Sequence, residues 1–431
     1  MKNRKALALI AILALVAAAC GGSGSGGSDE AEVEVETTEA PATTEAPATT
    51  AAPAADPLVL ASLMPLSGDL ASLGPGIALG AALAVEQINA AGGINGQPVQ
   101  LIEGDSGCDG AVALTSLNDV IAQGAQGVMG AACSGTSLAI LDTAIAAEVV
   151  MVSPSNTSPQ FTKIDKKGFY ARTAPSDLLQ GDVLASLLVE DGVQTVSIIS
   201  RADSYGRGLA EATAAAFEAA GGTVKTIVYH ATDATEFTSE VTAVGKGGAD
   251  AIVGILFPET GCGVLQPAFE QGLLDTPWYM TDGVKDAGLA SLCGLGTALD
   301  GFKGTAPGSA AGEAKDAFEA AYAEVSADGS PTFIFAPQAY DAVMLMAISA
   351  AANGVTGPEI ASGLVAASSG GEKCIGVACI ALAADGVDVD YVGASGEIEL
   401  NAVGDPTAAT YDIWTTEGDT NPVLKSVDFG S

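Results

Sequence analysis

From residue 57 onward, apolar and polar positions follow two periods that succeed one another regularly. Short apolar runs of strand length are separated by longer segments in which apolar residues recur at helical spacing. The first runs predict strands, and the segments between them predict helices: strands at 58–63, 98–105, 126–133 and 150–156, and helices at 77–94, 110–124 and 136–150. This order, with its short turns, indicates a parallel sheet covered by helices on both faces.

A second series with the same rhythm starts near residue 175. It predicts helices at 177–193, 206–222 and 237–247, and strands at 194–201, 223–230 and 249–256. A doubly wound domain of about 120 residues fits each series. The remaining stretch predicts helices at 312–325 and 336–354 and strands at 396–401 and 408–416. It has too few strands to stand alone, so we expect it to complete the two earlier domains.

The carboxyl ends of the predicted parallel strands are the expected place for a ligand. In open α/β sheets, ligands bind there, beside the N-termini of helices. Two such domains facing each other form a cleft, in which backbone N–H groups and hydroxyls can hold an anionic group.

The N-terminal residues 1–19 are predicted to be an export signal. A basic start precedes an apolar run, 6–16, which is too short to span a bilayer comfortably. The small residues 17–19 followed by Cys20 resemble a bacterial lipobox, in which the Cys thiol is acylated, although the first position is Ala where Leu is usual. The alternative is an ordinary signal peptide followed by a chance Cys.

Residues 20–56 have the composition of a tether. A Gly/Ser tract and an acidic run precede three Thr/Pro-rich hexapeptides that begin at Thr37, Thr43 and Thr49. Such tracts cannot bury enough apolar surface to become ordered. We therefore expect a disordered spacer between a lipidated Cys20 and the folded part; the alternative is a low-complexity insert without function.

Composition and charge exclude several classes of function. The chain has 16 Lys and Arg against 52 Asp and Glu, a formal net charge of −36. This argues against nucleic acid and anionic lipid as partners, because both are bound by clustered Lys and Arg. The only histidine, His230, rules out mechanisms and zinc sites that need a His pair. Apolar residues make up 48%, but aromatic residues only 5%, so the cores are expected to consist mainly of Ala, Val, Leu and Ile.

Eight segments in the same order resemble the branched-chain amino-acid-binding family of extracytoplasmic substrate-binding proteins, which serve ABC importers. They are INAAGGINGQPVQLIEGDSGCD (88–109), GAACSGTS (130–137), MVSPSNTSP (151–159), YARTAPSDLLQG (170–181), SYGRGLA (204–210), GILFPETG (254–261), MTDGV (280–284) and SGEIELNAVGDPTAATYDIW (395–414). The resemblance implies an α/β type I periplasmic binding fold: two doubly wound lobes with a ligand cleft between them and a hinge that the chain crosses several times. We expect lobe 1 at 57–175 plus about 304–394, and lobe 2 at 176–303 plus about 395–431.

The resemblance also implies ligand-binding residues. A ligand α-carboxylate would be held by Ser134 and Thr157, and Ser134 precedes a helix expected to begin near residue 136. The α-ammonium would bind the Ser155 carbonyl and Asp282, which stands where the family often has Glu, with Tyr205 from the same lobe. The alternatives are structural: a helix N-cap for Ser134, turn residues at Thr157 and Asp282, and a surface aromatic at Tyr205.

Two apolar positions of this chain align with positions that are often aromatic around the ligand in the family. They are Leu73 and either Leu256 or Phe257, which suit an aliphatic or aromatic side chain. The alternative for these residues is ordinary packing, and these few positions do not identify the solute.

Cysteine usage fits an exported protein. Apart from Cys20, six cysteines remain, which allow 15 connectivities. We expect Cys108–Cys133, which matches the family's disulfide, then Cys374–Cys379, which are close in sequence, and by elimination Cys262–Cys293. A metal site is the rival interpretation; with one His and no C-x-x-C motif, we expect no metal.

The function implied is a lipid-anchored receptor on the outer face of the bacterial cytoplasmic membrane, which delivers a small amino acid to an ABC permease. We expect no catalysis and no cofactor. One alternative is a sensory module of the same fold, and another is a receptor for an amide or urea-like solute. An enzyme using Asp282 or Glu259 as acid or base is the third, but no nucleophile accompanies them.

Overall fold

The computed structural model describes residues 56–330 and 333–429. The predicted signal segment 1–19, Cys20 and the spacer up to residue 55 therefore lie outside the described residues. The lipid anchor and the spacer stay predictions.

The first sheet consists of five parallel strands in the order β2-β1-β3-β4-β5. They are β1 (Val59–Met64), β2 (Gln100–Asp105), β3 (Gly127–Gly130), β4 (Val150–Ser153) and β5 (Tyr170–Arg172). Every residue of the inner strand β1 is buried, whereas none of the edge strand β2 is. This difference explains why 58–63 is a continuous apolar run and 100–105 contains charged residues.

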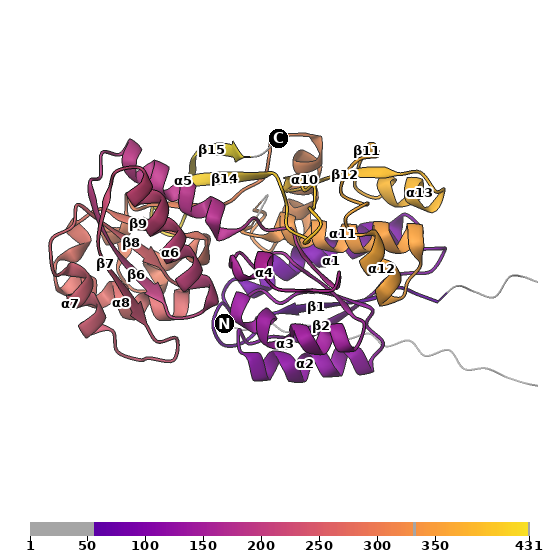
Figure 1. Ribbon diagram of the computed structural model, residues 1–431, viewed down its shortest axis with the longest axis horizontal. Coiled ribbons are helices and arrows are strands. Elements are labelled where there is room, and N and C mark those ends of the chain that lie inside the picture. The colour runs from indigo at the N-terminus through magenta and orange to yellow at the C-terminus, as the bar shows by residue number, and fades with distance from the viewer. Residues whose placement is uncertain (1–55, 331–332, 430–431) are drawn as a thin grey trace, which may run out of the picture. The chain divides into compact units, whose positions relative to one another are not determined.

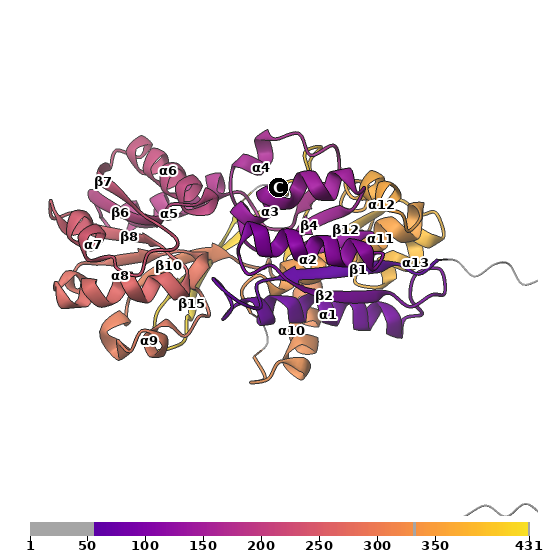
Figure 2. The ribbon, with the colours of Figure 1, turned by 90° about the horizontal axis from the view of Figure 1, so that it is seen from below.

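Helices cover both faces of this sheet (Figures 1 and 2). On one face, α1 (Gly74–Ala90) packs along α11 (Ala336–Asn353), which contacts β3 and β4. On the other face lie α2 (Gly110–Ala122) and α3 (Ser134–Ala146). α2 begins where its sequence supplies a cap, because the Asp109 carboxylate accepts hydrogen bonds from the N–H groups of Ala111 and Val112 at 2.8 and 3.0 Å.

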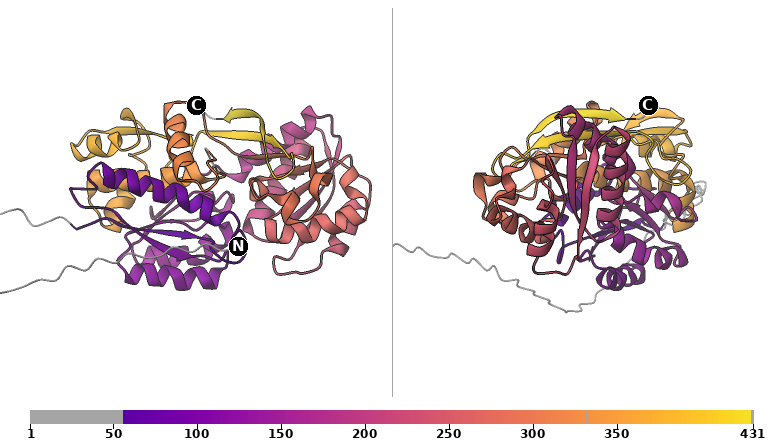
Figure 3. Two further views of the ribbon diagram at one scale, coloured as in Figure 1. Left: turned by 180° about the vertical axis from the view of Figure 1, so that it is seen from behind. Right: turned by 60° about the vertical axis from the view of Figure 1, so that its left-hand side comes forward.

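The second sheet has seven strands in the order β15-β14-β10-β9-β8-β6-β7. Its parallel part comprises β6 (Thr195–Arg201), β7 (Thr223–His230), β8 (Ala251–Ile255), β9 (Trp278–Met280) and β10 (Lys303–Pro307). The C-terminal strands β14 (Ala409–Thr415) and β15 (Val423–Phe429), yellow in Figure 3, extend it antiparallel. Its helices are α5 (Asp177–Glu190), α6 (Ser204–Ala219), α7 (Thr238–Gly245) and α8 (Pro258–Glu270).

A small third sheet lies beside α11. It consists of β11 (Glu372–Ile375), β12 (Val389–Gly393) and β13 (Gly396–Glu397), with α13 (Ala378–Ala384) packed against α11. Nearby are α10 (Glu313–Val325) and α12 (Gly357–Gly363). In the described part, the chain thus passes between the first and second sheets after β5, after β10 and after β13. The expected fold, two α/β lobes joined by several crossings, is confirmed.

Several predicted boundaries differ from the structure, and two of them lie near the site or the hinge. The helix expected near residue 136 begins at Ser134, with Cys133 as its N-cap. The strand expected at 396–401 is limited to β13 and pairs with β12. It ends early because the chain then turns: the Asn401 side chain accepts hydrogen bonds from the N–H groups of Val403 and Asp405 at 2.9 and 3.1 Å. The lobe limits near 304 and 395 stay a prediction.

A buried acid ties the third sheet to α11. The Asp341 carboxylate on α11 accepts hydrogen bonds from the Tyr391 hydroxyl at 2.7 Å, from the N–H groups of Ala394 and Ser395 at 2.7 and 2.8 Å, and from the Ser395 hydroxyl at 2.6 Å. Burial raises the pKa of Asp341 to about 6, although these hydrogen bonds oppose the shift. The carboxylate therefore holds the β12–β13 turn in place.

We predict that Asp341→Ala lowers the free energy of unfolding by about 3 kcal/mol or more, because each buried donor left without an acceptor costs about 1–3 kcal/mol. Chemical denaturation of the purified protein measures the change. Asp233→Ala, in an exposed loop, serves as the control and is expected to change the free energy of unfolding by less than about 0.5 kcal/mol. Equal effects of the two substitutions would contradict this role of Asp341.

Candidate ligand-binding cleft

The predicted site residues follow the carboxyl ends of strands in both sheets, as expected for open α/β sheets. In the first sheet, Ser134 follows β3 at the start of α3, and Ser155 follows β4. In the second, Tyr205 follows β6, Phe257 follows β8, and Asp282 follows β9 in the 3-10 turn η2 (Asp282–Val284). Strand polarity therefore brings residues that are far apart in sequence to facing edges of the two sheets.

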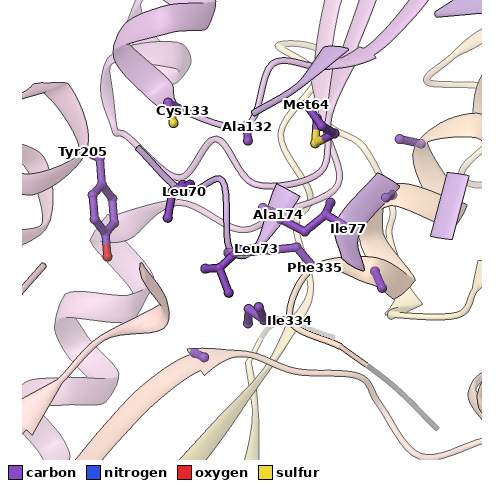
Figure 4. Packing of buried hydrophobic residues seen from close by; sticks show 14 of the residues in the cluster. Met64, Leu70, Leu73, Ile77, Ala132, Cys133, Ala174, Tyr205, Ile334 and Phe335 are labelled. Atoms are coloured by element: carbon purple, nitrogen blue, oxygen red, sulfur yellow. The ribbon is translucent and has the colours of Figure 1, made fainter. Parts of the chain in front are cut away.

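These residues enclose a cavity of about 20 Å³ between the lobes. Such a volume holds little more than one water molecule, which needs about 10–15 Å³ on this measure. Figure 4 shows Leu70, Leu73, Ile77, Phe335 and Tyr205 around it. The complete lining is Leu70, Leu73, Ile77, Ala132, Cys133, Ser134, Ser155, Tyr205, Phe257, Asp282, Gly283 and Phe335. One part of the lining is thus aliphatic and aromatic, and another carries hydroxyls and a carboxylate.

The first lobe contributes hydroxyls and the N-terminus of α3. Ser134 is the first residue of this 13-residue helix, and its hydroxyl accepts a hydrogen bond from the Ser158 N–H at 3.4 Å. The Ser155 hydroxyl donates to the Ala132 carbonyl at 3.1 Å. Within the described residues, no side chain caps the N-terminus of α3. The positive end of the helix dipole therefore faces the cavity beside two hydroxyls, an arrangement that suits a carboxylate.

The second lobe contributes one buried acid. Asp282 Oδ1 accepts hydrogen bonds from Gln180 Nε2 at 2.8 Å and from the Tyr205 hydroxyl at 2.9 Å. The Tyr205 ring in turn stacks on Phe257, with ring centroids 5.4 Å apart. Burial raises the pKa of Asp282 to about 6, against the effect of both hydrogen bonds. At neutral pH a carboxylate therefore lies in the cavity wall, where a cation would stabilise it.

A second acid lies behind Asp282. Asp177, the first residue of α5, is fully buried, and its backbone N–H donates to the Thr157 carbonyl at 2.8 Å. Burial and then the nearby Asp282 raise the pKa of Asp177 well above its usual range. Asp177 and Gln180 thus connect the Thr157 turn of one lobe to the acid of the other.

The turn that carries Ser155 and Thr157 is held by a buried ion pair. Arg172 Nη1 donates to the carbonyls of Asn156 and Ser158 at 3.0 and 2.9 Å, and Arg172 Nε donates to Asp405 at 2.9 Å. Burial alone would raise the pKa of Asp405, but the Arg172 charge and the Thr162 hydrogen bond outweigh it and keep the pKa below its usual range. Arg172 thereby fixes the backbone on both sides of Thr157.

Two contacts join the lobes at the mouth of the cavity. The Arg201 guanidinium bonds the Asp69 carboxylate at 2.8 Å and lies 3.8 Å from the ring centroid of Phe257. Glu259 Oε2 accepts a hydrogen bond from the Leu70 N–H at 2.9 Å. Glu259, the other acid considered for catalysis, is therefore engaged in joining the lobes.

The structure brings most of the predicted site residues together. Ser134, Ser155, Tyr205, Asp282, Leu73 and Phe257 line the cavity. Thr157 and Leu256 are buried next to it without lining it, since Leu256 packs against Gly261 within its own lobe. The ligand-binding roles of all eight residues stay predictions.

Several residues at the site were missed by the sequence analysis. Leu70, Ile77 and Phe335 line the cavity, and Gln180, Asp177 and Arg172 support it. A signal existed for three of them, because Arg172, Asp177 and Gln180 stand inside the segment 170–181 that resembles the family. Their side chains had no role assigned because polar residues in such a segment are usually exposed.

Three disulfides join the six described cysteines in the expected pairs. Cys108–Cys133, Cys262–Cys293 and Cys374–Cys379 have Cα–Cα distances of 5.5, 4.9 and 5.4 Å, within the usual range. The first bond links the loop before α2 to the N-cap of α3, beside Ser134. Among residues 56–330 and 333–429, no cluster of His, Cys, Asp and Glu could hold a metal ion, and no helix is long and apolar enough to cross a bilayer.

Comparison with known proteins shows the family. Residues 57–373 match the family described as periplasmic binding protein, and the chain belongs to it. An amino acid binding protein of Pseudomonas aeruginosa is 34% identical over 236 residues, which are 53% of this chain and 61% of the length of that relative. The leucine-, isoleucine-, valine-, threonine- and alanine-binding protein of the same organism is 29% identical over 302 residues, 68% of this chain and 78% of that protein. The resemblance to the branched-chain amino-acid-binding proteins is confirmed.

Solved structures share the type I fold. One is the branched-chain amino acid transporter substrate binding protein LivJ of Streptococcus pneumoniae, in complex with isoleucine. It superimposes with a TM-score of 0.72 at 22% identity, and the match covers 87% of this chain and 100% of the LivJ chain. Another is a solute binding protein of an ABC transporter from R. palustris, in complex with benzoate. Its TM-score is 0.70 at 18% identity, and the match covers 87% of this chain and 98% of that protein's chain. The fold is therefore common to proteins with different ligands.

We predict that Asp405→Asn lowers the free energy of unfolding by about 3–5 kcal/mol at pH 7, because it leaves the buried Arg172 charge without its partner. The pKa of Asp405 is lower in the folded protein than in the unfolded chain, so its contribution is present above the unfolded pKa and is lost as the pH falls through the folded pKa. Denaturation at pH 7 and at pH 3 measures both effects.

Glu190→Gln is the control for this substitution, since it removes one partner of an exposed pair with Lys425. It is expected to cost less than about 1 kcal/mol. A loss at Asp405 no larger than that at Glu190 would contradict the anchoring role.

Proposed function

We propose that this protein is an extracytoplasmic, lipid-anchored solute receptor that delivers a small amino acid to an ABC importer. The family and the amino acid-binding relatives support the receptor class. Because the match to the first relative spans 61% of its length, the activity of that whole protein comes to this chain as a proposal.

The observation that carries the proposal is the pairing of two opposite charge preferences in one cavity. Ser134, at the N-terminus of α3, lies on the first lobe, and the Asp282 carboxylate lies on the second. An α-amino acid has a carboxylate for the first and an ammonium for the second. Both charges of the zwitterion would thus be compensated when the lobes close, and neither lobe compensates both alone.

The lining favours an amino acid over an aromatic acid of the benzoate type. Benzoate has no cation, so it would leave Asp282 buried and uncompensated. The apolar side chains of Leu70, Leu73 and Ile77 suit an aliphatic side chain. A branched-chain or similar amino acid meets both conditions.

Closure of the two lobes is the proposed mechanism. The solute would bind to one lobe first, and the second lobe would then complete the charge compensation. The Arg201–Asp69 ion pair and the Glu259–Leu70 hydrogen bond cross the cleft and stabilise the closed form. Recognition and closure suffice for this role, so we propose that the protein does no chemistry and needs no cofactor.

The anchor would hold the receptor near its permease. The lipobox-like sequence at Cys20 and the spacer up to residue 56 have the composition of a lipid anchor and a tether. With this anchor and tether, the folded part would lie at the outer face of the cytoplasmic membrane.

We predict that Asp282→Asn weakens leucine binding by about 10²–10³-fold, the equivalent of about 3–5 kcal/mol for one lost partner of a buried pair. Ser134→Ala is expected to cost less, about 1–3 kcal/mol, because the helix N-terminus still faces the carboxylate. Calorimetry on the full-length protein at pH 7.5 measures both, with the exposed Asp275→Asn as a control that should bind normally.

The affinity for leucine, measured by the same calorimetry, is expected to fall as the pH is lowered. Since burial raises the pKa of Asp282 to about 6, the acid becomes protonated as the pH falls through that value. An ammonium ligand stabilises the ionised form, so affinity is expected to fall about tenfold per pH unit below pH 6. Asp282→Asn should remove this dependence. Normal leucine binding by Asp282→Asn would instead point to a solute without an ammonium at this position, such as an amide or urea-like compound.

We predict that the protein is recovered with membranes and that Cys20→Ser releases it or blocks its maturation, because the thiol is the proposed site of acylation. Fractionation of cells that express each form, followed by immunoblotting, measures this. Unchanged membrane recovery of the Cys20→Ser form would refute the anchor and leave the ligand-binding proposal intact.

A further inference from the structure

A second cavity adjoins the one between the lobes, and Phe335 lines both. It has a volume of about 220 Å³, against about 20 Å³ for the first. Its wall combines the segment before α11 with residues that follow β9 and β10, among them Lys285, Phe333, Ile334 and Gln338. In Figure 4, Phe335 lies next to Leu73, with Ile334 below it. The aromatic side chain of Phe335 therefore stands between the small cavity and the large one.

The space available in the closed form points to a movement of Phe335. A cavity of about 20 Å³ has room for about one water molecule, and any amino acid is several times larger. While the Arg201–Asp69 pair joins the lobes, room for a solute has to come from the lining itself. Phe335 has φ +61°, which is unusual for a bulky residue and is often found at functional sites. Rotation of its side chain would join the two cavities.

The second cavity is lined by a buried cationic side chain, that of Lys285. Lys285 follows Asp282 by three residues, is 7% exposed, and lines the larger cavity while Asp282 lines the smaller one. Among the described residues, its salt bridge is a long one, 3.4 Å to Asp286, whose carboxylate also accepts the Ile334 N–H at 2.9 Å. A lysine ammonium has three donors, so Lys285 can still bind an acceptor.

The other charged residues of this cavity have partners of their own. Lys315 pairs with Glu319, and the Asp412 carboxylate accepts a hydrogen bond from the Ser426 hydroxyl at 2.7 Å. The charged residues of the lining are two lysines and two acids, so their formal charges sum to zero. Lys285 has the longest of these contacts, 3.4 Å to Asp286, and is therefore the group best placed to bind a further acceptor. A carboxylate would form strong, charge-assisted hydrogen bonds with its ammonium.

We propose that the cavity lined by Lys285 is the distal half of the ligand site, reached past Phe335, and that it extends the range of solutes from branched-chain amino acids to amino acids whose long side chain ends in a carboxylate. This inference rests on the proposed function, since Ser134 and Asp282 would hold the α-carboxylate and α-ammonium. The side chain would then run along Leu73 and Ile77, turn Phe335 aside and end at Lys285.

The test compares two amino acids that differ only at the far end of the side chain. Norleucine ends in a methyl group where 2-aminoadipate has a carboxylate, and leucine reports on the inner half alone. Calorimetry on the full-length protein at pH 7.5 is expected to show 2-aminoadipate binding on the order of tenfold or more tighter than norleucine, as for a charge-assisted hydrogen bond. Lys285→Met should abolish that advantage and change norleucine binding less than about twofold.

Two further variants keep the result interpretable. Lys303→Met removes a partly exposed lysine that pairs with Asp191 outside the cavity and should change neither affinity. Phe335→Leu should tighten 2-aminoadipate relative to leucine, because a smaller side chain leaves the passage open. Thermal unfolding confirms that each variant is folded, and Lys285→Arg, which keeps the charge, should retain the preference.

The outcomes separate this inference from the proposed function. Equal binding of 2-aminoadipate and norleucine, or a preference that survives in Lys285→Met, would overturn the distal site; leucine binding would then leave the amino acid receptor standing. If none of the three amino acids binds, the proposed function falls, and the distal site falls with it.

Discussion

A carboxylate buried between two lobes is the constraint on which the site depends. Asp282 receives hydrogen bonds from Gln180 and Tyr205, yet burial still raises its pKa to about 6. A buried charge is stable only when it is paired, and the described lining brings no cation to Asp282 in the cavity that it shares with Ser134. A cationic group on the solute would supply the missing charge. The need of Asp282 for a paired cation would then govern both which solute is recognised and whether the two lobes close on it.

The rest of the molecule keeps that carboxylate opposite the N-terminus of α3. Two sheets present the carboxyl ends of their parallel strands to each other, so the loops of both lobes meet. The Arg172–Asp405 pair holds the turn around Thr157, and the Cys108–Cys133 disulfide holds the start of α3. Both interactions fix the backbone close to the cavity. A displacement there would alter the distance between the N-terminus of α3 and the Asp282 carboxylate.

The elements that sequence reasoning found are those with a strong period or a long apolar run. β1, β6 and β8 are inner strands, and nearly all of their residues are buried and most are apolar. α8 was missed because it contains Pro267 and two glycines, which are typical of turns. β9 was missed because three residues are too few to show a period. The strand expected at 396–401 is shorter for a different reason: the Asn401 side chain accepts hydrogen bonds from the N–H groups of Val403 and Asp405, and the chain turns there.

The sequence by itself determined the α/β alternation, the acidic character and the resemblance to the family. Through that resemblance it also indicated about half of the residues that line the cavity, such as Ser134, Tyr205 and Asp282. These properties are local or collinear, so a reader of one chain can see them. Only the tertiary structure decided that Phe257 and not Leu256 lines the cavity, that Arg172 and Gln180 support it, and that Phe335 separates it from a larger one containing Lys285. Those facts depend on which side chains meet across two sheets and a hinge, and packing between segments more than a hundred residues apart leaves no period in the sequence.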